Sequence, residues 1–135
     1  MSTIGCGLVV LLGVARGDTA EGAERLARKT AELRIFPDAT SRFDLSLLDI
    51  GGEALVVSQF TLLADTRRGR RPDFMAAAPP EEAEPLADRY VSALEQTGVR
   101  VATGRFGAHM LVEIHNDGPV TILLDTVDLD RPRRA

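Results

Sequence analysis

The sequence predicts a mixed α/β domain in which β-sheet dominates. Two segments, about 20–34 and 80–97, repeat apolar residues at the spacing of an amphipathic helix. Short apolar runs precede, separate and follow them, so the predicted order is strand, helix, strands, helix, strands. With 135 residues, 44% of them hydrophobic and 27% charged, the chain suits one globular domain over 1–135, including a charged tail at 128–135.

The first half predicts a strand and then a helix. Residues 8–14 are a continuous run rich in valine and leucine, which is typical of a buried strand. Asp18 is followed three residues later by a glutamate, a helix-start pattern, and the helix should end near Arg34. Turn-forming residues follow at 38–42 and 51–52.

A second strand is predicted at 54–63, and it runs into the polar sequence Ser58-Gln59-Phe60-Thr61. Strict alternation would place Ser58 and Thr61 on opposite faces of the strand. If both hydroxyls serve one site, the strand must therefore bulge or end inside this motif.

The second half predicts another helix and three more strands. Apolar residues from Ala83 to Leu94 follow the helical spacing, and Gly98 suits the position just past the end. Pro85 lies inside this pattern, and proline in a helix interior costs on the order of 3 kcal/mol. The helix should therefore begin close to Pro85 or kink there. The further strands are expected at 99–102, 110–115 and 120–126.

Composition argues against several classes of protein. The longest apolar run near the start is too short to span a bilayer, and no signal peptide is expected. Cys6, the single cysteine, allows no internal disulfide, fits a reducing cytosol and is expected to be a small packing residue. His109 and His115 belong to no cluster with metal-ligand spacing. The net charge of −4 argues against bulk binding of nucleic acid.

Two polar motifs interrupt apolar runs, where folds often place chemistry. They are Ser58-Gln59-Phe60-Thr61-Leu62 and Asn116-Asp117-Gly118-Pro119-Val120-Thr121. From the residues alone, the first is a strand with two tolerated hydroxyls and the second is a loop. Only about 5–6% of X–Pro bonds are cis, so the residues alone favour a trans bond at Pro119. A triad of Ser58, His115 and Asp117 is a minor alternative.

A basic cluster follows the first motif directly. Its members are Arg67, Arg68, Arg70 and Arg71, around Gly69. A solvated charged loop is the ordinary interpretation of such a run. On an acidic chain, this local patch favours contact with one part of an RNA, because guanidinium groups suit phosphate.

The two motifs, in this order, resemble the signatures of the D-aminoacyl-tRNA deacylases. These enzymes release D-amino acids, and sometimes glycine, from mischarged tRNA. The resemblance runs from about residue 5 to residue 126, and the sequence from Thr103 to Met110 also fits the family. It implies a three-layer ββα domain, a cytoplasmic homodimer, and chiral proofreading on D-aminoacyl-tRNA and possibly on Gly-tRNA. It implies no cofactor, no metal, and neither a membrane nor a DNA partner.

The resemblance also assigns roles to residues. The ester would lie near the Thr61 hydroxyl and the main-chain N–H groups of Phe60 and Thr61, with Ser58 beside them, where these donors could stabilise an oxyanion. The 2′-hydroxyl of the terminal ribose would assist hydrolysis, and whether Thr61 is a nucleophile stays open. Substrate-binding roles are implied for Gln59, Met110, Asn116, Gly118, Pro119 and Thr121. Binding of tRNA is implied for Arg67, Arg68, Arg70 and Arg71.

The Gly118-Pro119 pair would carry the chiral selection. The resemblance implies that its bond is cis and that it is inserted into the active site of the other subunit. Two carbonyl oxygens pointing the same way could accept hydrogen bonds from the substrate amino group, while an L side chain would run into main chain.

Members of this family normally begin with an extra strand and most of a hairpin before the segment matched by residues 4–8. A missing strand would leave a neighbouring edge unpaired, and we favour a misassigned start codon over a shortened member. Pro85 is a milder departure. Two other functions stay open: a non-catalytic protein that binds the tRNA acceptor end, and a small-molecule esterase that uses Ser58.

Overall fold

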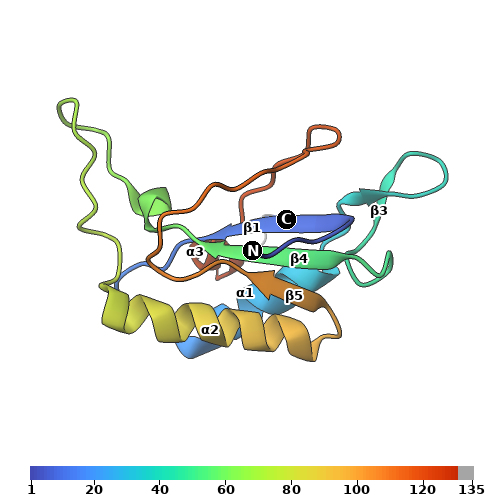
Figure 1. The fold of residues 1–135 in the computed structure, drawn as a ribbon, viewed down its shortest axis with the longest axis horizontal. Helices are drawn as coiled ribbons and strands as arrows, with labels where there is room; N and C mark the ends of the chain where they lie inside the picture. The colour runs from blue at the N-terminus through green and yellow to red at the C-terminus, as the bar shows by residue number, and fades with distance from the viewer. Residues whose placement is uncertain (131–135) are drawn as a thin grey trace.

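The computed structural model describes residues 1–130, and it confirms the mixed α/β class. Its central sheet has three parallel strands in the order β1-β4-β5. These strands are β1 (Gly7–Leu12), β4 (Glu53–Ser58) and β5 (Arg100–Thr103). The helices α1 (Ala20–Glu32) and α2 (Pro80–Gln96) lie side by side on one face of this sheet (Figure 1).

The core lies between the two helices and the sheet. Small side chains allow close approach, since Ala27 and Ala31 of α1 and Ala54 of β4 are fully buried. Tyr90 of α2 is the largest fully buried side chain. Its hydroxyl donates to Thr30 Oγ1 of α1 at 2.8 Å, so the polar end of this ring is satisfied inside the core.

Both predicted helices are present, with corrections at their ends. The N-cap of α1 is Thr19 rather than Asp18, because Thr19 Oγ1 accepts from Gly22 N at 3.1 Å. The Asp18 carboxylate instead accepts from Ala15 N at 2.8 Å. Pro80 is the first residue of α2, which confirms the predicted bounds of about 80–97, and the helix continues through Pro85, so of the two alternatives the start close to Pro85 is wrong.

The strand predictions need larger corrections. The strand predicted at 54–63 ends at Ser58, and a 3₁₀ helix, η1 (Phe60–Leu63), follows it. The strand predicted at 99–102 is confirmed as β5, shifted by one residue. Within the described residues, 110–115 and 120–125 form no strand, and residue 126 begins a helix. The apolar residues of these runs suit a strand, but a strand also needs a partner for its backbone groups. The sheet is therefore smaller than predicted.

A short antiparallel hairpin was not predicted. Strands β2 (Phe36–Pro37) and β3 (Phe43–Leu45) pair around the predicted turn at 38–42. Asp38 Oδ1 closes this turn by accepting from Thr40 N at 2.8 Å and from Arg42 N at 3.0 Å. These hydrogen bonds hold the pKa of Asp38 below its usual range, with the Thr40 hydroxyl as the largest cause.

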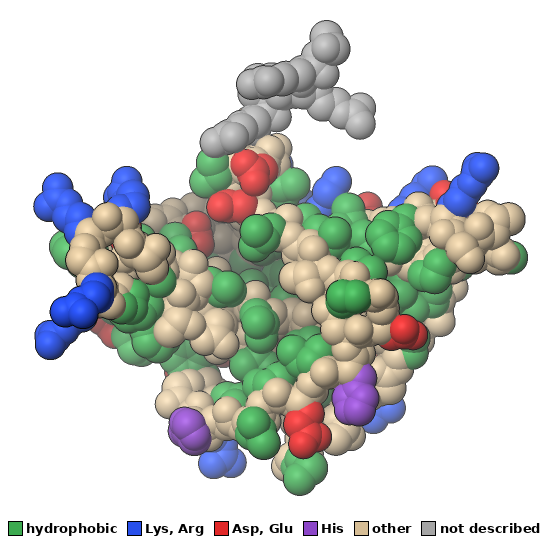
Figure 2. Space-filling view, turned by 90° about the horizontal axis from the view of Figure 1, so that it is seen from above, with side chains coloured by type: hydrophobic (Ala, Val, Ile, Leu, Met, Phe, Trp, Pro, Cys, Tyr) green, Lys and Arg blue, Asp and Glu red, His purple; other side chains and the backbone are tan. Residues whose placement is uncertain are grey.

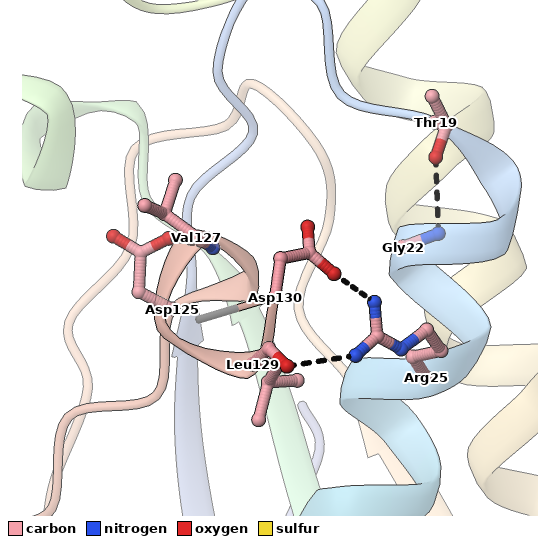
Figure 3. A network of polar contacts seen from close by, with 7 residues as sticks. All are labelled: Thr19, Gly22, Arg25, Asp125, Val127, Leu129 and Asp130. Carbon is pink, nitrogen blue, oxygen red and sulfur yellow. Dashed lines mark hydrogen bonds and ion pairs between the residues drawn. The ribbon is translucent and has the colours of Figure 1, made fainter. Parts of the chain in front are cut away.

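The end of the described chain is tied to the first helix (Figure 3). The predicted tail at 128–135 overlaps a short helix, α3 (Thr126–Leu129), which is capped by Asp125 Oδ1 accepting from Val127 N at 3.0 Å. Arg25 of α1 pairs with the Asp130 carboxylate and donates to Leu129 O at 3.1 Å. The charged tail predicted at 128–135 therefore begins with residues that are held against α1, while 131–135 lie outside the described residues.

The face of the sheet opposite α1 and α2 is covered by an extended segment of the chain. The segment from 104 to 125 passes over it as extended chain (Figure 1). Figure 2 shows that apolar side chains are spread over this face around a central hollow. Leu111 and Leu123 of this segment are 88% and 89% exposed, and Cys6 is also exposed rather than packed. Among residues 1–130, no helix is long and apolar enough to cross a bilayer.

Candidate active site

The first motif lies where two parallel strands end together. The register pairs Leu12 of β1 with Ser58 of β4, and Gln59 N then donates to Leu12 O at 2.8 Å. After this bond the chain turns into η1. Sheets of parallel strands commonly bind ligands at their carboxyl edge. The strand ends inside the motif, which meets the condition for Ser58 and Thr61 to serve one site.

Gly13 lets η1 approach the end of β1 closely. A Cβ at Gly13 would lie 3.2 Å from Leu62 Cβ and 3.4 Å from Gln59 O. This role of Gly13 could not be predicted from the sequence, because nothing in the local pattern shows what packs against it.

The Thr61 hydroxyl is held by a neighbouring amide. Gln59 Nε2 donates to Thr61 Oγ1, and Thr61 lies exposed at the surface. Because this oxygen accepts from Gln59, its own proton is free to be donated to a substrate. A threonine nucleophile would instead need a base to take its proton, and no described residue accepts from this hydroxyl.

Further donors come from the main chain. Phe60 and Thr61 are the first residues of η1, so their N–H groups have no partner within that helix. The N–H groups and the Thr61 hydroxyl therefore belong to one short turn at the edge of the sheet. Such fixed donors can stabilise negative charge that develops on a carbonyl oxygen.

Apolar side chains border this turn. Phe60 is 57% exposed, and its ring lies edge-to-face with Phe74, with centroids 5.1 Å apart. Met110 lies near the ends of β4 and β5, since a Cβ at Gly104 would come within 2.8 Å of Met110 Sδ and 3.8 Å of Val57 Cγ1. Met110 is half-buried there.

The second motif forms a closed turn of its own. Asn116 Oδ1 accepts from Val120 N at 2.8 Å, and Asn116 Nδ2 donates to Thr121 Oγ1 at 3.1 Å. The Gly118-Pro119 bond is cis, as the resemblance implied. Gly118 has φ 150°, and a Cβ there would lie 2.9 Å from Val120 N, so only glycine fits. The turn projects from the molecule well away from η1 (Figure 1).

The structure therefore separates the two motifs within one chain. Gln59 and Thr61 are hydrogen-bonded, and so are Asn116 and Thr121, but no hydrogen bond within residues 1–130 joins the two pairs. The Asn116 and Thr121 side chains shape the turn. No hydrogen bond or ion pair among residues 1–130 links Ser58 with His115 or Asp117, so the triad is not assembled.

The basic cluster lies on a loop that projects beyond η1. The loop is closed at its base by two backbone bonds, Asp65 N to Asp73 O at 2.7 Å and Asp73 N to Asp65 O at 2.9 Å. Figure 2 shows basic side chains gathered at this end of the molecule. A hollow of about 430 Å³ is lined by Asp65, Arg67, Arg68, Arg71 and Asp73.

The family model of "D-Tyr-tRNA(Tyr) deacylase" matches residues 1–125 of this chain. The chain belongs to that family. A protein from Chloroflexus aurantiacus named D-aminoacyl-tRNA deacylase is 59% identical over 135 residues, covering 100% of this chain and 84% of its own length. A protein of the same name from a Roseiflexus species is 62% identical over 133 residues, covering 98% and 86%.

Two solved structures share the fold of this chain. One titled "c-Myc DNA Unwinding Element Binding Protein" is 42% identical, with a TM-score of 0.86 over 93% of this chain and 85% of that chain. Another, of a probable eukaryotic D-amino acid tRNA deacylase, is 17% identical with a TM-score of 0.64 over 76% of this chain and 75% of that chain, and shows likeness of fold alone.

Two further features of this deacylase-family chain were not predicted. Asp65 forms an ion pair with Arg67, two residues later in the chain. Phe74 packs on Phe60 across the whole basic loop, which no local pattern indicates. Among residues 1–130, no three metal-ligating side chains come together.

Proposed function

We propose that this chain hydrolyses the ester bond of D-aminoacyl-tRNA and releases a free D-amino acid and tRNA. The family match over residues 1–125 and the relatives named D-aminoacyl-tRNA deacylase support this function. The observation that carries it is the turn at the end of β4. There the Thr61 hydroxyl, oriented by Gln59, lies beside two main-chain N–H groups that have no partner in η1.

In the proposed reaction, water adds to the ester carbonyl and the bond to the ribose oxygen breaks. The carbonyl oxygen receives hydrogen bonds from Thr61 Oγ1 and from the N–H groups of Phe60 and Thr61 as it becomes negative. The neighbouring ribose 2′-hydroxyl of the tRNA assists proton transfer. In this proposal Thr61 positions the ester and forms no covalent bond, because its oxygen accepts a hydrogen bond from the Gln59 amide and faces no base.

The aminoacyl group lies between Ser58, Gln59 and Met110 in this proposal. Ser58 and Gln59 are half-buried at the end of β4, and Met110 packs beside the same edge of the sheet. The rim therefore offers polar groups on one side and a thioether on the other. Removal of glycine from Gly-tRNA is compatible with such a pocket and stays a prediction.

We further propose a homodimer in which Gly118 and Pro119 of one subunit enter the site of the other. Their turn is exposed, stands away from its own η1, and is stiffened by the two Asn116 bonds. Main-chain carbonyls there would accept from the substrate amino group, and an L side chain would collide with main chain. The enzyme would act in the cytoplasm as one domain over 1–135.

Single-turnover deacylation of D-Tyr-tRNA and L-Tyr-tRNA, measured side by side, tests this function. We expect the D ester to be cleaved and the L ester to be left intact. Cleavage of both esters would contradict chiral selection. Tight tRNA binding with cleavage of neither would identify the alternative, a non-catalytic protein that binds the acceptor end.

A further inference from the structure

The four arginines of the basic loop are not equivalent. Arg67 is fully engaged with Asp65: its Nε donates to Oδ1 at 2.9 Å, its Nη2 donates to Oδ2 at 2.7 Å, and its main-chain N donates to Oδ1 at 3.0 Å. Hydrogen bonds from the Arg67 side chain hold the pKa of Asp65 below its usual range, and Asp65 raises the pKa of Arg67 in turn. Among residues 1–130, Arg68, Arg70 and Arg71 make no ion pair.

Asp65 belongs to the closed base of the loop. Its backbone makes both bridging bonds to Asp73, whose own Oδ1 accepts from Met75 N at 2.7 Å. Ala64, one residue earlier, donates to Thr61 O at 3.2 Å. The Asp65 to Arg67 pair is therefore anchored to the same turn that carries the proposed ester site.

Stability does not explain this pair. The Arg67 side chain is 87% exposed, and exposed ion pairs contribute little to folding. The pair fixes the long Arg67 side chain at the hollow, whose other lining residues are Arg68, Arg71 and Asp73. Asp65 balances one of the four arginines of the loop and Asp73 is a second acid there, so four positive and two negative charges leave residues 65–73 with a net charge of +2.

We propose that the Asp65–Arg67 pair is a positioning device that shapes this hollow so that Arg68 and Arg71 together hold one phosphate of the RNA backbone. This inference rests on the proposed function, because it takes tRNA as the ligand. A guanidinium group offers paired donors that match two oxygens of a phosphodiester, so two arginines around one hollow form a defined seat. Arg67 supports this seat and does not contact the phosphate.

The Asp65→Asn variant separates this inference from simple electrostatics. If charge alone mattered, removing a carboxylate and releasing Arg67 would tighten tRNA binding. If the pair positions the loop, binding weakens although the protein has become more positive. We expect the dissociation constant of Asp65→Asn for deacylated tRNA, at about 0.1 M salt, to be about three- to tenfold higher than that of the wild-type chain. The reason is that the loop and the Arg67 side chain must then be ordered on binding.

Salt dependence identifies which arginines meet the phosphate. We expect Arg68→Gln and Arg71→Gln each to lower the slope of log affinity against log salt concentration, and the double variant to lower it by about 0.7–0.9, the loss of one phosphate contact. Arg67→Gln should weaken binding but leave the slope unchanged. A slope change at Arg67 equal to that at Arg68 would overturn the inference.

Asp44→Asn is the matched control, because it removes the same charge from another exposed ion pair, with Arg34 at 3.1 Å. Its strand β3 lies at the opposite end of the molecule from the basic loop (Figure 1). The affinity of Asp44→Asn for tRNA should be equal to that of the wild-type chain or slightly higher. All variants should have similar thermal unfolding temperatures. Binding by Asp65→Asn as tight as by Asp44→Asn would refute the positioning role alone. No tRNA binding by the wild-type chain would refute the proposed function as well.

Discussion

The hydrogen bond from Gln59 to Thr61 decides how the threonine hydroxyl can work. The amide N–H directed at Oγ1 uses one of the two lone pairs of this oxygen and leaves the hydroxyl proton available for donation. An exposed hydroxyl with a free proton is a donor to an incoming carbonyl. At the scale of single residues, this geometry supports the proposal that Thr61 orients the ester and stabilises developing charge.

This view predicts the behaviour of Thr61→Ala. We expect single-turnover deacylation of D-Tyr-tRNA to slow by about 10²-fold, the effect of removing one oxyanion donor. Thr61→Ser, which keeps the hydroxyl, should retain most of the rate. Acid-quenched samples of the wild-type chain should contain no aminoacyl-protein. An acyl-enzyme that depends on Thr61 would contradict this assignment.

At the scale of elements, helices α1 and α2 act as one support behind the sheet. Their contact is made by buried alanines and by the Tyr90 to Thr30 hydrogen bond, and Thr30 Oγ1 itself donates to Leu26 O at 2.8 Å. A tyrosine is tolerated in this core because its hydroxyl finds a partner there. β1 and β4, whose ends hold the site, pack on the same core.

The burial of Tyr90 between these helices makes the stability of the fold depend on pH. Burial raises the pKa of Tyr90, while the bond with Thr30 opposes part of that rise. The folded chain thus holds this proton more tightly than the unfolded chain. Its contribution to stability is complete below the unfolded pKa of about 10 and is lost as the pH rises through the folded value. Tyr90 is the only tyrosine, so tyrosinate absorbance reports on it alone.

We therefore expect the tyrosinate titration of the folded chain to lie above pH 10 and to coincide with loss of structure. Tyr90→Phe should be less stable by about 0.5–1.5 kcal/mol at pH 8, the value of one lost hydrogen bond. The difference in free energy of unfolding between Tyr90→Phe and the wild-type chain should be smaller at pH 11 than at pH 8. Urea denaturation at the two pH values measures it. A difference that stays constant with pH would show that folding leaves the titration of the ring unchanged, and one that grows with pH would show that folding lowers its pKa; either result would contradict the prediction.

At the scale of the whole molecule, the two signature motifs lie on separate parts of the fold. The end of β4 holds the donors, and the 116–121 turn projects away from it (Figure 1). A site that needs both is incomplete in one chain. A second copy related by two-fold symmetry would supply each site with the other subunit's turn.

Mixing two inactive variants tests this arrangement. Thr61→Ala damages the donor turn, and Gly118→Ala damages the projecting turn, where a Cβ would lie 2.9 Å from Val120 N. In a mixed dimer, one site carries both changes and the other carries neither. Equal mixing with subunit exchange should restore about a quarter of the wild-type sites. No recovery, with mixed dimers shown by mass spectrometry, would place both motifs in the same subunit's site.

The sequence predicted most reliably what is decided within a few residues. Both main helices follow from the spacing of their apolar residues, and the strands at 8–14 and 99–102 follow from their composition. The Thr19 cap was assigned one residue too early, because Asp and Thr are both good caps and only the chain path selects between them.

The predictions from sequence failed where a structure depends on a distant segment that pairs or packs with it. The runs at 110–115 and 120–126 contain strand-forming residues, yet a strand exists only where another backbone pairs with it. The end of β4 at Ser58 is set by the length of β1 beside it, which no property of the 54–63 run reveals. The pairing of Phe60 with Phe74 likewise depends on how the basic loop folds back.

The sequence by itself determined the α/β class, the two helices and the two motifs that place the chain in the deacylase family. The tertiary structure alone decided that β4 stops at Ser58, that Gln59 holds Thr61, and that Arg67 is neutralised by Asp65. The physical reason is range. Helical spacing and turn chemistry act between neighbours in the chain, whereas strand ends, hydrogen-bond partners and ion pairs depend on which atoms folding brings together.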